Sequence, residues 1–134
     1  MSPVFADTSF YLALLNPGDR HHRRAVALAR EVRRLTVTTE FILVEVGNAL
    51  SGTPRGRDRF LTLAERIGQQ GSVTVVPASH KSFTEGMEHY RHRRDKTWSL
   101  TDCIPFVVMQ DHDLTDALTA DHHFEQAGFA VLLK

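Results

Sequence analysis

The sequence predicts an α/β fold, with a mainly parallel sheet of about five short strands covered on both faces by helices. Short apolar or β-branched runs alternate with longer segments of helical periodicity along the whole chain. Such alternation is typical of a parallel sheet between two helical layers. The 134 residues are enough for one core, and 42% hydrophobic with 24% charged residues is typical of a globular protein. We therefore expect residues 1–134 to form a single three-layer α/β/α domain.

The first half of the chain is expected to contain two strands. PVFAD (3–7) is a short apolar strand that ends in an acid, and TSFYLALL (8–15) is a helix stopped by NPGD. A longer helix is expected over about 20–35. The β-favouring run TVTT (36–39) then forms a strand, and EFILVEVGNALS (40–51) forms a helix.

The second half begins with SGTPRGR (51–57), a turn-like stretch expected to be a loop between helices. Beyond it the alternation of helices and strands continues to the end of the sequence. The expected elements are helices at about 58–70 and 79–93, a helix that Asp102 opens, a short helix at 122–128 closed by Gly128, and strands at 72–78, 116–121 and 129–134.

The charges balance overall but are unevenly placed. Sixteen basic and sixteen acidic residues give a formal charge of zero, which argues against a general polyanion binder. Three stretches are nevertheless basic: Arg20–Arg34, Arg55–Arg59 and Tyr90–Lys96. They are either solvated helix faces or a phosphate-facing rim around an acidic centre.

The sequence contains a single cysteine, Cys103, so no internal disulfide can form, which fits a reducing cytoplasm. No apolar run approaches the ~20 residues that cross a bilayer. The N-terminus lacks the basic and apolar regions of a signal peptide. We expect a cytoplasmic protein with no membrane association.

Two acids stand where predicted strands end. Asp7 follows the first strand and precedes a helix, and Asp121 ends the strand DALTAD. Each is either an N-cap, which needs only a short side-chain oxygen, or part of a ligand site. In parallel sheets ligands bind at the carboxyl ends of the strands, so both acids are candidates.

Two further acids lie within apolar helical segments. Glu45 falls between Phe41, Ile42 and Ala49 on one face of its helix, with no lysine or arginine at i±3 or i±4. It points into the protein unless it is a glutamate that snorkels at the edge of the core.

Asp102 shares a helical face with Phe106 and Met109 and so leans toward the core. Its alternative role is a cap or a first-turn acid, where the helix dipole favours a negative charge. Pro105 limits how far upstream a regular helix can start. Cys103 is expected to be a small core residue.

If the four acids meet at the sheet edge, they require a counter-charge. Two unit charges at ~5 Å repel by roughly 3 kcal/mol at an effective dielectric near 20. Mg²⁺ or Mn²⁺ suits carboxylate oxygens better than Zn²⁺ does, because no Cys/His ligand spacing accompanies the acids. The paired histidines beginning at His21 and His122 are expected to be surface or capping residues.

Four blocks of the sequence, FADTSF, TEFILVEVGNAL, DKTWSLTDCIPFVVM and ALTADHHFEQAGF, resemble those of PIN-domain ribonucleases. Their order and spacing are similar to the toxin of VapBC-type toxin–antitoxin pairs. The likeness covers nearly the whole chain except 52–94. It implies a PIN-like fold and a metal-dependent endoribonuclease that uses Mg²⁺ or Mn²⁺ and leaves 5′-phosphate and 3′-hydroxyl ends. It also implies an RNA substrate, a cognate antitoxin and a homodimer.

The resemblance also implies roles for particular residues. Asp7 and Asp102 are the firmest metal ligands by this analogy, and Asp95 is similar to a peripheral acid found in part of the family. Pro105 departs from the family pattern, where a small residue is usual. The implied catalytic and metal-binding acids are Asp7, Glu45, Asp102 and Asp121, with Thr8, Ser9 and Thr119 in support.

Other functional classes are compatible with parts of the pattern. A haloacid-dehalogenase-type phosphohydrolase would have a second aspartate where Ser9 stands, and a receiver domain would have one in SVTVVPAS, which has none. A histidine-dependent ribonuclease would form cyclic phosphates without a metal. A non-toxin RNA-processing nuclease with a PIN fold and an inactive PIN-like binding module remain alternatives.

Overall fold

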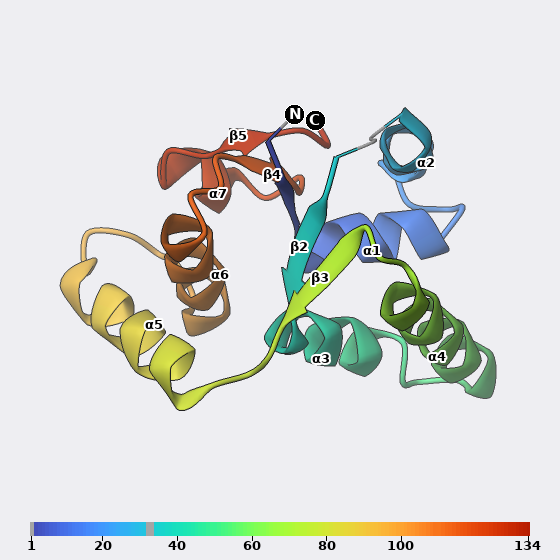
Figure 1. Cartoon of the computed structure of the whole chain (residues 1–134), viewed down its shortest axis with the longest axis horizontal. Coiled ribbons are helices and arrows are strands. Elements are labelled where there is room, and N and C mark those ends of the chain that lie inside the picture. Colours follow the sequence, from blue (N-terminus) through green and yellow to red (C-terminus); the bar gives the residue numbers. More distant parts are fainter. Residues whose placement is uncertain (1, 32–33) are drawn as a thin grey trace.

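The computed structural model describes residues 2–31 and 34–134 and contains a five-stranded sheet with helices on both sides (Figure 1). All strand pairs are parallel, in the order β3-β2-β1-β4-β5. This confirms the predicted α/β class. The strands are β1 (Val4–Ala6), β2 (Thr36–Thr39), β3 (Val73–Val76), β4 (Asp116–Leu118) and β5 (Ala130–Val131). The helices are α1 (Thr8–Leu15), α2 (His22–Glu31), α3 (Glu40–Ala49), α4 (Pro54–Gln69), α5 (His80–His92), α6 (Leu100–Asp111) and α7 (His122–Gln126).

The central strand β1 sets the position of the site. Its three residues are fully buried, because helices cover both faces of the sheet. Beyond β1 the chain builds the sheet first to one side, through β2 and β3, and later to the other side, through β4 and β5. The strand order therefore reverses between β1 and β4, and the carboxyl ends at such a switch point form a crevice in open α/β sheets.

Several helix boundaries differ from those expected. The helix expected over about 20–35 begins at His22, and the chain is no longer helical at Leu35; residues 32 and 33 of that prediction lie outside the described residues. The expected loop 51–57 is wrong in its second half, because α4 already begins at Pro54. Thr53 caps this helix by accepting a hydrogen bond from the Gly56 N–H at 3.0 Å, and proline is favourable in a first turn.

Helix α6 starts further upstream than Pro105 suggested. Ser99 and Asp102 form a capping box, in which each side chain accepts from the other residue's backbone N–H at 3.1 and 3.0 Å. Asp102 therefore lies in the first turn and does not open the helix. Pro105 lies inside the helix and is fully buried.

The short helix α7 ends as the sequence predicts. Gly128 adopts φ 96°, a left-handed conformation that glycine reaches without strain, and the chain turns there toward β5. No helix in residues 2–31 and 34–134 is long and apolar enough to span a membrane.

Candidate functional site

Asp7 lies at the junction between β1 and α1, at the N-cap position of the helix. Its side chain nevertheless makes no capping hydrogen bond. Instead, Oδ2 accepts hydrogen bonds from the Thr119 hydroxyl at 2.8 Å and from the Ser9 hydroxyl at 3.4 Å. The side chain thus joins the first turn of α1, through Ser9, to the residue that follows β4, Thr119.

Thr119 joins the ends of the two central strands. It is fully buried just after β4, and while its hydroxyl donates to Asp7 it accepts from the Asp121 N–H at 3.1 Å. Ser9 Oγ lies 3.0 Å from the same hydroxyl and accepts from the Ala120 N–H at 3.3 Å. This network fixes Asp7 relative to the loop that carries Asp121.

Burial and neighbouring charges act on Asp7 together. They raise the pKa of its carboxyl from 3.8 to about 6, mainly through burial. The Thr119 hydrogen bond opposes this rise, whereas the charges of Asp121 and Asp102 add to it. Asp7 therefore lies close to both of these carboxylates.

Glu45 reaches the same place from the helix after β2. It is half-buried, and burial raises its pKa from 4.5 to about 7, with the charge of Asp7 as the next cause and that of Asp102 also contributing. The Thr8 hydroxyl opposes the rise, although its buried Oγ1 lies outside hydrogen-bonding geometry with any described residue. The expected apolar face is only partly correct, since Ile42 is buried but Ala49 is exposed.

Asp102 is held through one oxygen. Oδ2 accepts from the Ser99 N–H at 3.0 Å and lies 2.9 Å from Nδ1 of His123, while the side chain is 16% exposed. Its helical neighbours Phe106 and Met109 are fully buried, as the sequence predicts. Asp102 is therefore both a first-turn acid of α6 and a side chain that leans toward the core. The two roles are compatible, because its capping oxygen and the site lie at the same end of α6.

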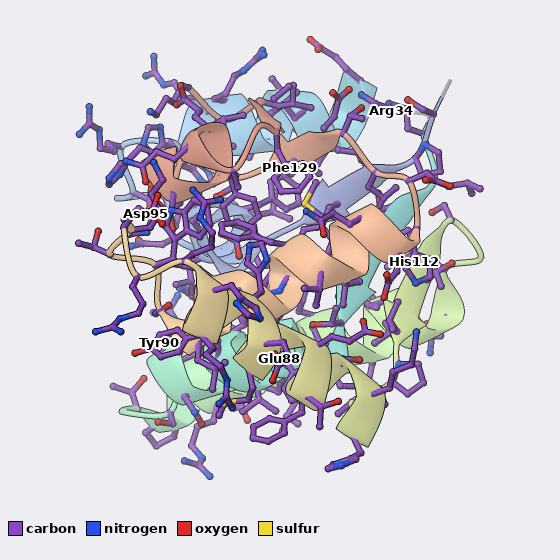
Figure 2. The ribbon with its side chains drawn as sticks, turned by 90° about the vertical axis from the view of Figure 1, so that its left-hand side faces the viewer. Arg34, Glu88, Tyr90, Asp95, His112 and Phe129 are labelled. Atoms are coloured by element: carbon purple, nitrogen blue, oxygen red, sulfur yellow. The ribbon has the colours of Figure 1, made fainter. Side chains whose placement is uncertain are left out.

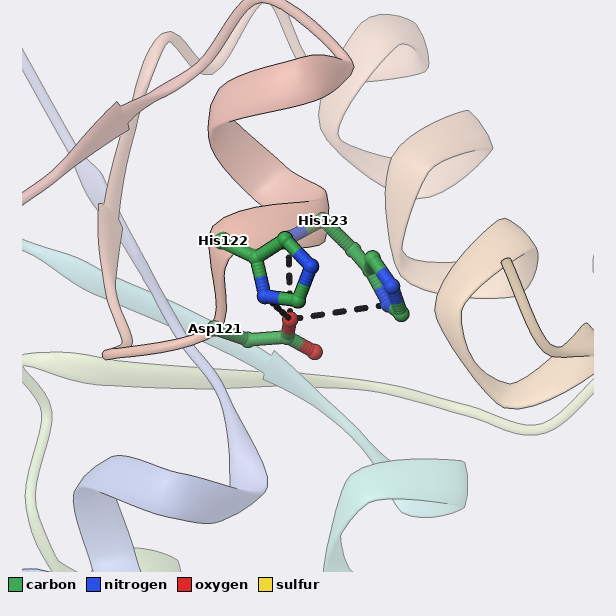
Figure 3. Close-up of side chains that lie close together, drawn as sticks. All are labelled: Asp121, His122 and His123. Atoms are coloured by element: carbon green, nitrogen blue, oxygen red, sulfur yellow. Dashed lines mark hydrogen bonds and ion pairs between the residues drawn. The ribbon is translucent and has the colours of Figure 1, made fainter. Parts of the chain in front are cut away.

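Asp121 caps α7 and faces two histidines (Figure 3). Oδ1 accepts from the His123 N–H at 2.9 Å and lies 3.5 Å from that residue's Nδ1 and 3.8 Å from Nδ1 of His122. One ligand-type atom from each of the three residues lies within 4.8 Å of the others. Asp121 is therefore an N-cap, which was one of its two predicted roles. Its carboxylate still lies at the sheet edge.

His123 lies at the site, although the sequence analysis did not include it among the candidate site residues. It was expected to be a surface or capping histidine, but its side chain is 20% exposed and its Nδ1 lies between the carboxylates of Asp102 and Asp121. His122 is 65% exposed, as expected for a surface residue. The available signal was the position of His123 two residues after Asp121, but nothing local pointed to its contact with Asp102. The prediction that a strand runs to Asp121 is wrong, because β4 ends at Leu118 and Asp121 caps α7.

Asp95 lies apart from this cluster. Its two oxygens accept from Nε and Nη2 of Arg93 at 3.0 and 3.1 Å, and the side chain is 61% exposed. The Arg93 hydrogen bond holds the pKa of Asp95 below its usual range. Its geometry fits the peripheral position expected from the sequence.

The donor set fits a hard divalent cation. The structure brings the carboxylates of Asp7, Glu45, Asp102 and Asp121 to one sheet edge, and no lysine or arginine within residues 2–31 and 34–134 forms an ion pair with any of them. The pKa values of Asp7 and Glu45 are raised mainly by burial and further by the neighbouring carboxylates, so the ionised forms are unfavourable without a counter-charge. Carboxylate oxygens match the preference of Mg²⁺ and Mn²⁺, and His123 adds a nitrogen that Mn²⁺ also accepts.

Comparison with known families identifies one match. The family model described as PIN domain matches residues 4–130, which is nearly the full length of the chain.

Among curated proteins, the chain is similar to the 23S rRNA-specific endonuclease VapC20 of Mycobacterium tuberculosis. The two are 28% identical over 126 residues, which cover 94% of this chain and 95% of the relative. The crystal structure of M. tuberculosis VapC20, described as a sarcin-ricin loop cleaving toxin, superposes with a TM-score of 0.85 at 26% identity. That superposition covers 95% of this chain and 96% of the other.

Two more distant structures share the fold. FitAcB from Neisseria gonorrhoeae has a TM-score of 0.67 at 18% identity, covering 98% of this chain and 96% of that one. DNA-bound VapBC from Salmonella typhimurium has a TM-score of 0.68 at 13% identity, covering 98% and 97%.

Proposed function

This chain belongs to the PIN domain family, and from that premise we propose that it is a metal-dependent endoribonuclease and the toxin of a type II toxin–antitoxin pair. The observation that carries the proposal is the convergence of four carboxylates at the switch point of the sheet, around a buried Asp7 whose pKa is raised to about 6. The likeness to an endonuclease specific for 23S rRNA over 95% of that protein's length supports RNA as the substrate and a ribosomal loop as the first RNA to test.

The proposed metal ligands are Asp7, Glu45, Asp102 and Asp121, with Mg²⁺ or Mn²⁺ as the ion. Bound there, a divalent cation would neutralise charge developing on the phosphate and lower the pKa of an attacking water. The protein itself positions the carboxylates, and no lysine or arginine of the described residues neutralises them.

Hydrogen bonds from the chain position the two firmest ligands. Thr119 and Ser9 donate to Oδ2 of Asp7, and the Ser99 N–H donates to Oδ2 of Asp102, which also contacts His123. Oδ1 of Asp102 has no hydrogen bond with a described residue. The catalytic geometry thus depends on side chains that never touch the substrate, a common property of metal sites.

The Thr8 hydroxyl has a supporting role in this proposal. Its Oγ1 is buried beside Glu45 without a hydrogen bond inside the described chain. A buried hydroxyl of this kind needs a partner, which an ordered water of the site would supply. Ser9, in contrast, is already engaged with Thr119.

The proposal includes protein partners. Structural neighbours are VapBC and FitAB assemblies, which supports a cognate antitoxin for this chain. An antitoxin tail with a basic side chain would suit the acidic site electrostatically. A homodimer and a cytoplasmic location also belong to this proposal.

The test is cleavage of RNA by the purified protein in Mg²⁺, Mn²⁺ or EDTA. We expect cleavage that disappears with the chelator and in Asp7→Asn and Asp102→Asn, with 5′-phosphate and 3′-hydroxyl products. Asp58→Asn is the matched control, because it removes the same charge from an exposed position on α4, outside both the acidic cluster and the basic segment, and it should keep its activity. Mn²⁺ affinity, measured by calorimetry, should fall in the first two variants and not in the control.

Three results would contradict the proposal. Cleavage that persists in EDTA in both variants would exclude the metal mechanism. Cyclic phosphate ends would indicate a histidine-dependent ribonuclease instead. RNA binding with no cleavage under any metal condition would favour the inactive binding module.

A further inference from the structure

A polar cavity of about 440 Å³ lies between the end of α5 and the start of α6. Tyr90, Arg93, Arg94, Lys96, Trp98 and Cys103 line it. The segment from Tyr90 to Trp98 carries four cationic side chains and one carboxylate. This α5–α6 pocket is therefore strongly positive within a chain whose formal charge is zero.

The pocket is held in shape by Trp98. This indole is only 5% exposed, and its Nε1 donates to Oε1 of Gln126 on α7 at 2.9 Å. The Arg93 guanidinium carbon lies 4.7 Å from the Trp98 ring centre, and His89 stacks on the same ring at 5.7 Å. A buried aromatic side chain thus anchors the basic segment to α5 through His89 and to α7 through Gln126.

Two of the cations have no carboxylate partner in the described residues, although Nζ of Lys96 lies 5.9 Å from the centre of the Trp98 ring. Asp95 neutralises Arg93 through two hydrogen bonds. Arg94 and Lys96, by contrast, form no ion pair with any residue in 2–31 and 34–134. Tyr90 at the mouth is 50% exposed, which is unusual for a large aromatic residue. Unpaired cations beside an exposed ring are the combination that binds nucleotides, through phosphate contacts and base stacking.

The pocket adjoins the acidic site. Cys103, which lines it, directly follows Asp102, and Trp98 directly precedes Ser99, whose N–H holds the Asp102 carboxylate. Arg34 forms an ion pair with Asp116, the first residue of β4, and therefore lies at the amino end of that strand, away from the acidic site. Figure 2 shows Tyr90 and Asp95 at the opposite end of the molecule.

We propose that the α5–α6 pocket is an RNA subsite that binds a nucleotide next to the scissile bond. Arg94 and Lys96 bind its backbone phosphate, and Tyr90 stacks on an unpaired base. The inference rests on the proposed nuclease function and specifies its substrate class: RNA with unstacked bases, such as a loop, because a paired base cannot reach the ring. It also explains how a polyanion approaches a cluster of carboxylates.

The test measures RNA affinity by fluorescence anisotropy in EDTA, where no cleavage occurs, with a labelled hairpin that carries the sarcin-ricin loop sequence. The variant is Arg94→Ala/Lys96→Ala. The matched control is Arg23→Ala/Arg30→Ala, which removes two exposed charges on α2, on the other side of the sheet (Figure 1). We expect about tenfold weaker binding for the first variant, and a salt-dependence slope smaller by about 1.4 for two lost contacts to single-stranded RNA. The control should change affinity less than about twofold.

A second variant tests the stacking role. Tyr90→Leu should weaken binding to the hairpin loop but leave binding to a blunt duplex of equal length unchanged. In cleavage assays with Mg²⁺, Arg94→Ala/Lys96→Ala should raise KM and leave kcat near the parent value, because neither side chain reaches the carboxylates.

The outcomes separate this inference from the proposed function. RNA binding that depends on the pocket, in a protein that never cleaves, would refute the nuclease proposal and keep the subsite. Normal KM and affinity in Arg94→Ala/Lys96→Ala would refute the subsite and leave the nuclease intact. Equal losses in both double variants would show general charge attraction only. Loss of antitoxin binding with unchanged RNA affinity would overturn the RNA assignment in favour of an acidic protein segment.

Discussion

Lowering the pH from 8 to 5 should stabilise the metal-free protein. The pKa of Asp7 is raised from 3.8 to about 6 and that of Glu45 from 4.5 to about 7, both mainly through burial. Since these pKa values are higher in the folded than in the unfolded chain, the folded state binds more protons between pH 4 and pH 7. The free energy of unfolding should therefore fall as the pH rises through this window. This is opposite in sign to the effect of a carboxylate held by an arginine.

The size of the effect follows from the two shifts. For Asp7, the difference in stability between pH 5 and pH 8 is about 1.4 kcal/mol. For Glu45 the same arithmetic gives about 2.5 kcal/mol, which we halve because the half-buried side chain is partly screened by solvent. Together they amount to about 2 to 3 kcal/mol, or about 1 to 2 M in a urea midpoint.

The assay is urea unfolding in EDTA at several pH values, with Asp7→Asn and the exposed Asp58→Asn as matched variants. The free energy of unfolding of Asp7→Asn should be up to about 3 kcal/mol higher than that of the parent at pH 8. Its gain on acidification should be less than half that of the parent, because Glu45 also loses its main charged neighbour. Asp58→Asn should follow the parent throughout. At pH 8, Mg²⁺ should raise the parent midpoint, and it should do so far less at pH 5.

The reasoning would be refuted by a constant difference between the parent and Asp7→Asn from pH 5 to pH 8. It would also be refuted if metal-free Asp7→Asn were clearly less stable than the parent at pH 8. Either result would mean that burial and the neighbouring carboxylates do not disfavour the ionised form of Asp7.

Two further predictions concern packing and the hydrogen-bond network. Gly86→Ala should lower the free energy of unfolding by about 1 to 3 kcal/mol, because a Cβ there would lie 2.5 Å from Cγ1 of Ile104 where α5 meets α6. Gly68→Ala, in open space on α4, should instead be neutral or stabilising in the same urea titration. Thr119→Val should destabilise the protein by about 1 to 3 kcal/mol, because a methyl group cannot donate to Asp7. A Thr119→Val midpoint equal to that of the parent would contradict the role given to this hydroxyl.

Local signals in the sequence were sufficient for most of the secondary structure. The run Thr36–Thr39 forms β2 with the expected bounds, and the helix from Thr8 to Leu15 agrees as well. These elements depend on side-chain period and on the residues that interrupt it. The start of α4 was misplaced because the cap at Thr53 followed by proline was assigned to a turn, although the same residues begin helices.

For the site, too, local signals in the sequence were sufficient only in part. The sequence alone identified Asp7 and Asp121 as acids at predicted strand ends, and Glu45 and Asp102 as acids in apolar helical segments, because period and charge can be read from neighbouring residues. Their catalytic and metal-binding roles stay predictions.

Only the tertiary structure decided how these acids are held. The Thr119 bond to Asp7 spans 112 positions and the His123 contact with Asp102 spans 21, separations at which spacing in one sequence carries no information. The parallel strand order brings these groups to one edge. Hydrogen bonds and burial there, which depend on the whole sheet and its helices, then set the orientation and the pKa of each carboxylate.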